Sequence, residues 1–192
     1  VENGTTAVDA LEELRAGGIE PAFEHVPVTR ALFLDGFGGR HDVTSAEPYA
    51  YFIRRGGAAG SLDGWLRSLA AAAGVRLCDG VAAPVDTDVV ATGPRQADGA
   101  AKEVVFASDL PDTVAVLFDP EVTPTGYAYL FCLDGHATFG VAQVRRVGAL
   151  ERARDLAWER FRHELGEFRA DRLHDGGQFM NWPPSWRRSA RN

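Results

Sequence analysis

The stretch Pro124-Thr125-Gly126-Tyr127-Ala128-Tyr129-Leu130-Phe131 begins with turn residues and continues as an alternation of aromatic and aliphatic side chains. Aromatic residues favour strands, and alternate side chains of a strand point to opposite faces of a sheet. A proline and a glycine at the start are typical of a turn. The stretch therefore predicts a β-strand that opens at a Pro-x-Gly turn and carries aromatic rings.

Similar runs on both sides of this strand predict a sheet. Val104–Ala107, Thr113–Phe118 and Ala137–Val144 are short, rich in β-forming residues and separated by turn residues, which favours antiparallel pairing. From residue 149 to about 168 the apolar period lengthens to that of a helix. The Gly/Pro-punctuated stretch 176–184 predicts a loop. We expect an α+β fold with a mixed or antiparallel sheet and a long helix across one face.

The first half predicts smaller elements. Leu62, Trp65, Leu66 and Leu69 lie on one face of a helix that Ser61 would cap. We expect a small unit of a helix and a hairpin at the N-terminus. It should pack beside a buried strand at 88–91, which runs into Thr92-Gly93-Pro94. The expected elements are a helix over 5–16, a β-hairpin over 29–34 and 41–44, strands over 49–53, 75–78 and 88–91, and the helix over 61–73.

Composition narrows the function classes. The 192 residues are 45% hydrophobic and 24% charged with a net charge of -7, which is typical of a soluble globular protein and disfavours a nucleic-acid surface. Two distant cysteines, Cys78 and Cys132, suit a reducing cytoplasm, where we place the protein. The five histidines lack metal-binding spacing, so we expect no metal, and no G-x-S-x-G nucleophile motif is present. The start at Val1, without methionine, suggests a piece of a longer protein.

The order of several motifs resembles one family. Pro124–Phe131 is similar to the P-x-G-Y-A-[WY]-[ILV]-F signature of geranylgeranyl reductase-like flavoproteins, whose fold resembles that of p-hydroxybenzoate hydroxylase, and Ala137–Ala142 matches that family's next strand. Arg54 before a helix, the Ala91-Thr92-Gly93-Pro94 strand end and the Gly176-Gly177 segment follow the family's order. The resemblance covers most of residues 49–182.

The resemblance implies an FAD-dependent oxidoreductase that reduces double bonds of an isoprenoid or other lipidic substrate. It assigns Arg54, Ala91, Thr92, Gly93 and Pro94 to the cofactor. Tyr127, Tyr129 and Phe131 would line an apolar substrate site. Residues 1–100 would then be an incomplete FAD-domain portion, and residues 101–192 the substrate-binding sheet with its long helix. Peripheral membrane association of the parent enzyme and its oligomeric state stay open.

The sequence also departs from the family pattern. The pyrophosphate-binding G-x-G-x-x-G is missing, because Gly36-Phe37-Gly38-Gly39 and the glycines of 56–60 have other spacings, and the late Gly-Asp segment is missing too. We therefore expect an internal fragment that is inactive by itself, and no catalytic acid or base is named. A monooxygenase or halogenase on the same scaffold, and a non-catalytic module for an apolar ligand or a partner, remain alternatives.

Overall fold

The structure, a computed structural model, describes residues 9–80, 88–89, 98–144 and 148–180. The chain divides into two compact units. The first comprises Val1–Arg30 and Thr44–Ala91, and the second comprises Ala31–Val43 and Thr92–Asn192. The units alternate along the chain because the second includes a segment from the N-terminal half.

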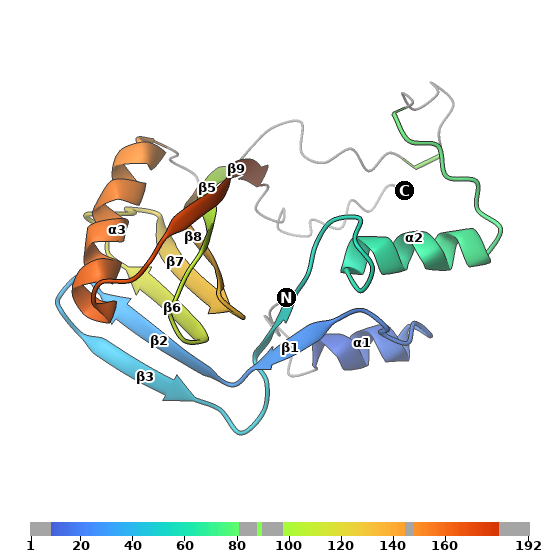
Figure 1. The fold of residues 1–192 in the computed structure, drawn as a ribbon, viewed down its shortest axis with the longest axis horizontal. Helices are drawn as coiled ribbons and strands as arrows, with labels where there is room; N and C mark the ends of the chain where they lie inside the picture. Colours follow the sequence, from blue (N-terminus) through green and yellow to red (C-terminus); the bar gives the residue numbers. More distant parts are fainter. Residues whose placement is uncertain (1–8, 81–87, 90–97, 145–147, 181–192) are drawn as a thin grey trace, which may run out of the picture. The chain divides into compact units, whose positions relative to one another are not determined.

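The first unit contains two helices and a two-stranded antiparallel sheet (Figure 1). The helices are α1 (Ala10–Ala16) and α2 (Leu62–Ala72), and β1 (His25–Val28) pairs with β4 (Ala50–Ile53). The predicted helices, and the strand over 49–53, are therefore confirmed within the described residues. Residues 5–8 of the first predicted helix lie outside them.

Side-chain caps explain where both helices begin. The Asp9 carboxylate accepts a 2.9 Å hydrogen bond from the Leu11 N–H, and Ser61 Oγ accepts one of 3.0 Å from the Gly64 N–H. Each bond satisfies a backbone donor that has no partner within its helix. Ser61 is therefore the predicted cap of α2. A small apolar core around Leu11, Phe23 and Tyr51 holds this unit together.

The second unit is built on a seven-stranded sheet in the order β3-β2-β6-β7-β8-β5-β9. Most neighbours with a known register are antiparallel, whereas β2 and β6 are parallel. The four strands predicted around Pro124–Phe131 are all present, so the sheet prediction is confirmed. Its strands are β2 (Arg30–Asp35), β3 (Arg40–Thr44), β5 (Gly99–Ala107), β6 (Thr113–Phe118), β7 (Gly126–Leu133), β8 (His136–Val144) and β9 (Asp171–Met180).

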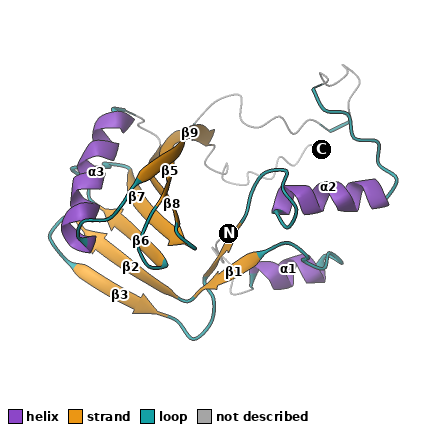
Figure 2. Ribbon diagram, in the orientation of Figure 1, coloured by secondary structure: helices purple, strands orange, loops and turns teal. Residues whose placement is uncertain are grey.

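One face of this sheet is covered by α3 (Leu150–Leu165), as Figures 1 and 2 show. Ala153, Ala157 and Phe161 lie on the buried side of the helix and pack with alternate strand residues in a single core. The small alanines allow the helix to approach the strands closely. The fold is thus α+β with a mixed, mainly antiparallel sheet and a long covering helix, as the sequence predicts.

Two predicted strands of the first half are wrong in their described parts. Val75–Cys78 is an exposed loop after α2, because no described strand lies beside it to satisfy its backbone. Asp88 and Val89 are also exposed and outside any strand, with 78% of Val89 accessible. The continuation of that predicted strand, Ala91-Thr92-Gly93-Pro94 included, lies outside the described residues.

The segment predicted as a C-terminal loop is instead β9 up to Met180. It pairs with β5 at the edge of the sheet, where Gly177 lies opposite Lys102 and an added Cβ would come within 3.2 Å of the Ala101 carbonyl oxygen. Glycine here permits close backbone approach rather than a turn. The predicted hairpin is also present as β2 and β3, but it extends this sheet instead of joining the first unit.

Candidate functional site

The three aromatic residues predicted to bind substrate lie on one face of β7. Ala128, Leu130 and Cys132 alternate with them and are completely buried in the core that α3 covers. Strand alternation therefore directs Tyr127, Tyr129 and Phe131 to the opposite face, which we call the open face. Their ring centroids follow one another at 6.0 and 5.0 Å. The structure thus brings all three predicted residues together, while their role stays a prediction.

Two further rings extend this row onto neighbouring strands. Phe118 of β6 lies 6.0 Å from Tyr127, and Phe33 of β2 stacks 6.2 Å from Phe118, measured between ring centroids. We call these five residues the aromatic stripe: Phe33, Phe118, Tyr127, Tyr129 and Phe131. Sequence reasoning missed Phe33 and Phe118, since their position depends on the parallel pairing of β2 with β6. The alternation within Thr113–Phe118 was the available signal for Phe118.

A polar pair interrupts the stripe at Tyr129. Its hydroxyl donates a 2.8 Å hydrogen bond to Glu103 Oε2 on β5. Burial raises the pKa of the Tyr129 phenol well above its ordinary value, and the neighbouring Glu103 carboxylate adds to this effect. Tyr129 therefore keeps its proton at neutral pH and acts as a hydrogen-bond donor on the open face.

Gly140 of β8 makes room for this contact. It pairs with Tyr129 on one side and with Glu103 on the other, so the phenol crosses β8 over Gly140. An added Cβ at Gly140 would lie 2.5 Å from the Tyr129 hydroxyl oxygen and 2.9 Å from the Lys102 carbonyl oxygen. Any other residue would thus displace the ring, so Gly140 is a structural determinant of the site.

Arg54, the predicted cofactor residue of the first unit, follows β4. Its guanidinium pairs with Glu24 at 3.4 Å, and its side chain is 62% exposed. Arg55 instead forms a two-pronged pair with Asp63, at 2.9 Å for each contact. Hydrogen bonds from the Arg55 guanidinium and, to a smaller extent, from the Gly56 N–H lower the pKa of Asp63 to about 2. Both arginines are thus exposed and paired with a carboxylate, Arg54 through one contact with Glu24 and Arg55 through two contacts with Asp63.

The glycine-rich segments in the described part of the chain do not fit a pyrophosphate. In the turn between β2 and β3, Asp35 Oδ1 accepts hydrogen bonds of 2.8 Å from both Phe37 and Gly39 N–H groups. Those bonds lower the pKa of Asp35, the Gly39 contribution being the larger. At the start of α2, Asp63 accepts from the Gly56 N–H at 2.6 Å. A carboxylate thus occupies each set of donors and would repel a phosphate.

Among the described residues, no three histidine, cysteine or acidic side chains lie close enough together to hold a metal ion. No helix in the same residues combines the length and hydrophobicity required to cross a membrane.

Comparison with known proteins identifies a shared fold. No family model matches the chain, and no curated protein is significantly similar to it. A solved structure of a geranylgeranyl bacteriochlorophyll reductase-like protein from Thermoplasma acidophilum is similar, with a TM-score of 0.58 and 16% sequence identity. The match covers 93% of this chain and 58% of that protein. The chain therefore has the fold of a portion of that reductase-like protein.

Proposed function

We propose that the chain is part of an FAD-dependent oxidoreductase and that its seven-stranded sheet holds an isoprenoid or other lipidic substrate. The aromatic stripe on the open face is the observation that carries this proposal. The fold shared with a geranylgeranyl bacteriochlorophyll reductase-like protein supports it. Because the match covers 58% of that protein, the activity would require further residues in addition to those described.

The stripe has the properties of an apolar binding surface. Phe118 and Tyr127 are 49% and 36% exposed, although neighbouring strand residues are completely buried. Contiguous exposed apolar surface commonly marks a binding site. Flat rings spaced 5.0 to 6.2 Å apart across β2, β6 and β7 offer an apolar surface to the methyl-branched chain of an isoprenoid, chiefly at Phe118 and Tyr127, because Tyr129 is only 9% exposed.

Tyr129 and Glu103 would orient the substrate on this surface. Their hydrogen bond fixes the position of the phenol, and burial keeps the phenolic proton in place. A hydroxyl at one end of a lipid would meet this polar pair, while its hydrocarbon chain follows the rings. The proposed roles of the chain's own residues are thus binding, orientation and retention of a proton at the Tyr129 oxygen.

A second function class is favoured by a specific observation. The described glycine segments are occupied by Asp35 and Asp63, so they offer no pyrophosphate site. A module that binds an apolar ligand without flavin would have the same stripe and would need no such site. FAD binding by the parent enzyme would instead require residues other than these segments.

Flavin retention and product analysis separate the two classes. The purified chain and the complete polypeptide encoded by its gene are mixed with FAD, gel-filtered and examined by absorbance. Each is then reduced with dithionite and given geranylgeraniol, and the lipid is analysed by mass spectrometry. The oxidoreductase proposal predicts flavin retention and a product with two added hydrogens for the complete polypeptide. A colourless complete polypeptide that leaves the lipid unchanged contradicts it and favours the binding module.

A further inference from the structure

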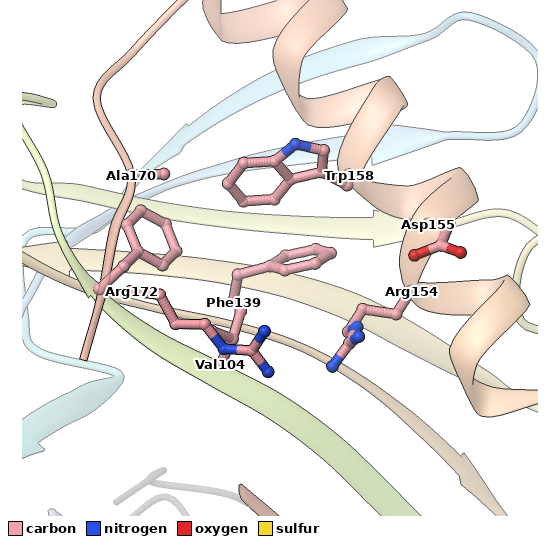
Figure 3. Close-up of a pocket in the computed structure, with 8 residues that line it drawn as sticks. Val104, Phe139, Arg154, Asp155, Trp158, Ala170 and Arg172 are labelled. Carbon is pink, nitrogen blue, oxygen red and sulfur yellow. The ribbon is translucent and has the colours of Figure 1, made fainter. Parts of the chain in front are cut away.

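A cavity of about 220 Å³ lies on the face of the sheet that α3 covers, opposite the aromatic stripe. Figure 3 shows its walls, which come from α3, from β5 and β8, and from the segment at the start of β9. All of its lining residues belong to the second unit. The lining consists of Val104, Phe106, Phe139, Arg154, Asp155, Trp158, Ala170 and Arg172.

The inner wall of the cavity is aromatic. Phe106 and Phe139 are each 1% exposed and form part of the core. The Trp158 ring lies 5.5 Å from the first and 5.0 Å from the second, between centroids, and is only partly buried. The small side chain of Ala170 leaves the space beside these rings open. Trp158 is therefore the ring that a flat, unsaturated group can contact, because Phe106 and Phe139 are almost fully covered.

Two guanidinium groups stand at the rim and extend toward one another in Figure 3. Arg154 is held by Glu151 at 2.8 Å and by Asp175 at 3.3 Å, and its side chain is only 19% exposed. Arg172 also pairs with Asp175, but its side chain is 59% exposed. The carboxylates thus hold Arg154 in place, whereas the guanidinium group of Arg172 remains accessible to a second anion.

The charges around the rim favour a carboxylate over an ammonium group. Lys102 is neutralised by Glu151, which lies outside the lining, whereas the lining itself contains two guanidinium groups and one carboxylate. Asp155 is the one acidic residue that lines the cavity itself. It follows Arg154 on α3 and would weaken anion binding without preventing it.

We propose that this cavity binds a small, flat carboxylate whose ring packs on the accessible part of Trp158 and whose carboxylate pairs with Arg172 beside Arg154. The cavity is smaller than the ~300 Å³ at which drug-sized sites begin, so the ligand has a single ring. Because the site lies on the other face of the sheet from the stripe, it is independent of the proposed oxidoreductase function.

Phenylacetate is a suitable probe of this site. The ¹⁵N-labelled chain is titrated with phenylacetate, with its neutral isostere phenylacetamide and with the cationic 2-phenylethylamine, and the Trp158 indole N–H is followed by NMR. We expect a dissociation constant of about 0.1–1 mM for phenylacetate, typical of a ligand of this size. The amide and the amine should bind at least about fivefold more weakly, because neither forms a charge-assisted pair with Arg172.

Variants of the lining test the assignment of each residue. Arg172→Gln should weaken phenylacetate binding about fivefold or more, whereas Asp155→Asn should strengthen it by removing a repulsion. Ala170→Leu should block the cavity and abolish the shifts. Arg169→Gln is the matched control, since Arg169 pairs with Asp171 outside the lining. Equal binding of phenylacetamide, an unaffected Arg172→Gln variant or weaker binding by Asp155→Asn would each overturn the proposal.

Discussion

The hydroxyl of Tyr129 and the carboxylate of Glu103, which are 26 residues apart in sequence, meet across Gly140 at 2.8 Å on the open face of the sheet. This contact links β7 to β5 across β8, the strand that lies between them. It supplies the polar group in an otherwise aromatic row. The site geometry therefore depends on three residues from three strands.

Removal of the Tyr129 hydroxyl should destabilise the protein. Tyr129→Phe leaves the ring in place but deprives Glu103 of its donor, so we expect a loss of about 1–2 kcal/mol in the free energy of unfolding. Urea denaturation followed by circular dichroism measures it. The control is the same substitution in a Glu103→Ala background, where the phenol has already lost its acceptor. An equal effect of Tyr129→Phe in the two backgrounds would show that the hydrogen bond contributes nothing specific.

Alanine at position 140 should be poorly tolerated. Its Cβ would clash with both the Tyr129 ring and the Lys102 carbonyl, so we expect Gly140→Ala to cost about 1–3 kcal/mol of stability. Gly176→Ala is the control, because its Cβ would approach Glu103 no closer than 3.4 Å. Thermal unfolding of both variants compares them. A Gly140→Ala protein as stable as Gly176→Ala contradicts the close passage of the phenol over β8.

The sequence predicted the elements whose side-chain pattern is local. Thr113–Phe118 became β6 without change, and Ser61 caps α2 as expected. The parallel pairing of β2 with β6 could not be predicted, since it joins segments about eighty residues apart and depends on which surface each must bury. For the same reason, Phe33 was not foreseen as part of the stripe.

Glycine caused the clearest failure of sequence reasoning. Gly176 and Gly177 predict a loop, yet both lie in β9, where pairing with β5 satisfies the backbone. The opposite error occurred at Val75–Cys78, whose β-forming residues have no adjacent described strand. A segment with low strand propensity therefore forms a strand where a partner strand lies beside it, and a segment with high strand propensity forms a loop where none does. The Tyr129 to Glu103 contact was likewise beyond prediction, because it depends on the register of three strands.

Tyr51 should titrate later than an ordinary tyrosine. Its hydrogen bond to Asp9, reinforced by burial, raises the pKa of the phenol to about 12. The folded state therefore holds the proton more tightly than the unfolded state. The resulting stabilisation is fully present below the ordinary pKa of 10.0 and is lost as the pH rises toward 12. Because the pKa of Tyr129 is also raised, ultraviolet titration should show one late-ionising phenol fewer in Tyr51→Phe than in the native chain. An equal number of late-ionising phenols in the two proteins would refute the assignment.

Loss of the α2 cap should destabilise the first unit. Ser61 is completely buried and its oxygen accepts the Gly64 N–H, so Ser61→Ala should cost about 1–2 kcal/mol. Amide hydrogen exchange at Gly64 should accelerate accordingly. Ser68→Ala, on the exposed surface of the same helix, should change the exchange rate little. Similar exchange in the two variants would argue against a cap at Ser61.

The most direct test of the central claim is isoprenoid binding to the aromatic stripe. Displacement of a fluorescent geranylgeranyl probe by geranylgeraniol is measured for the native chain, Phe118→Ser, Tyr127→Ser and Phe179→Ser. Phe179 is 72% exposed and pairs with Ala100, whose side chain alternates away from the open face, so it is the control. Each stripe substitution should weaken binding about tenfold, the effect of removing one buried ring, and Phe179→Ser should leave it unchanged. Native affinity in both stripe variants, or equal weakening by Phe179→Ser, would contradict the account.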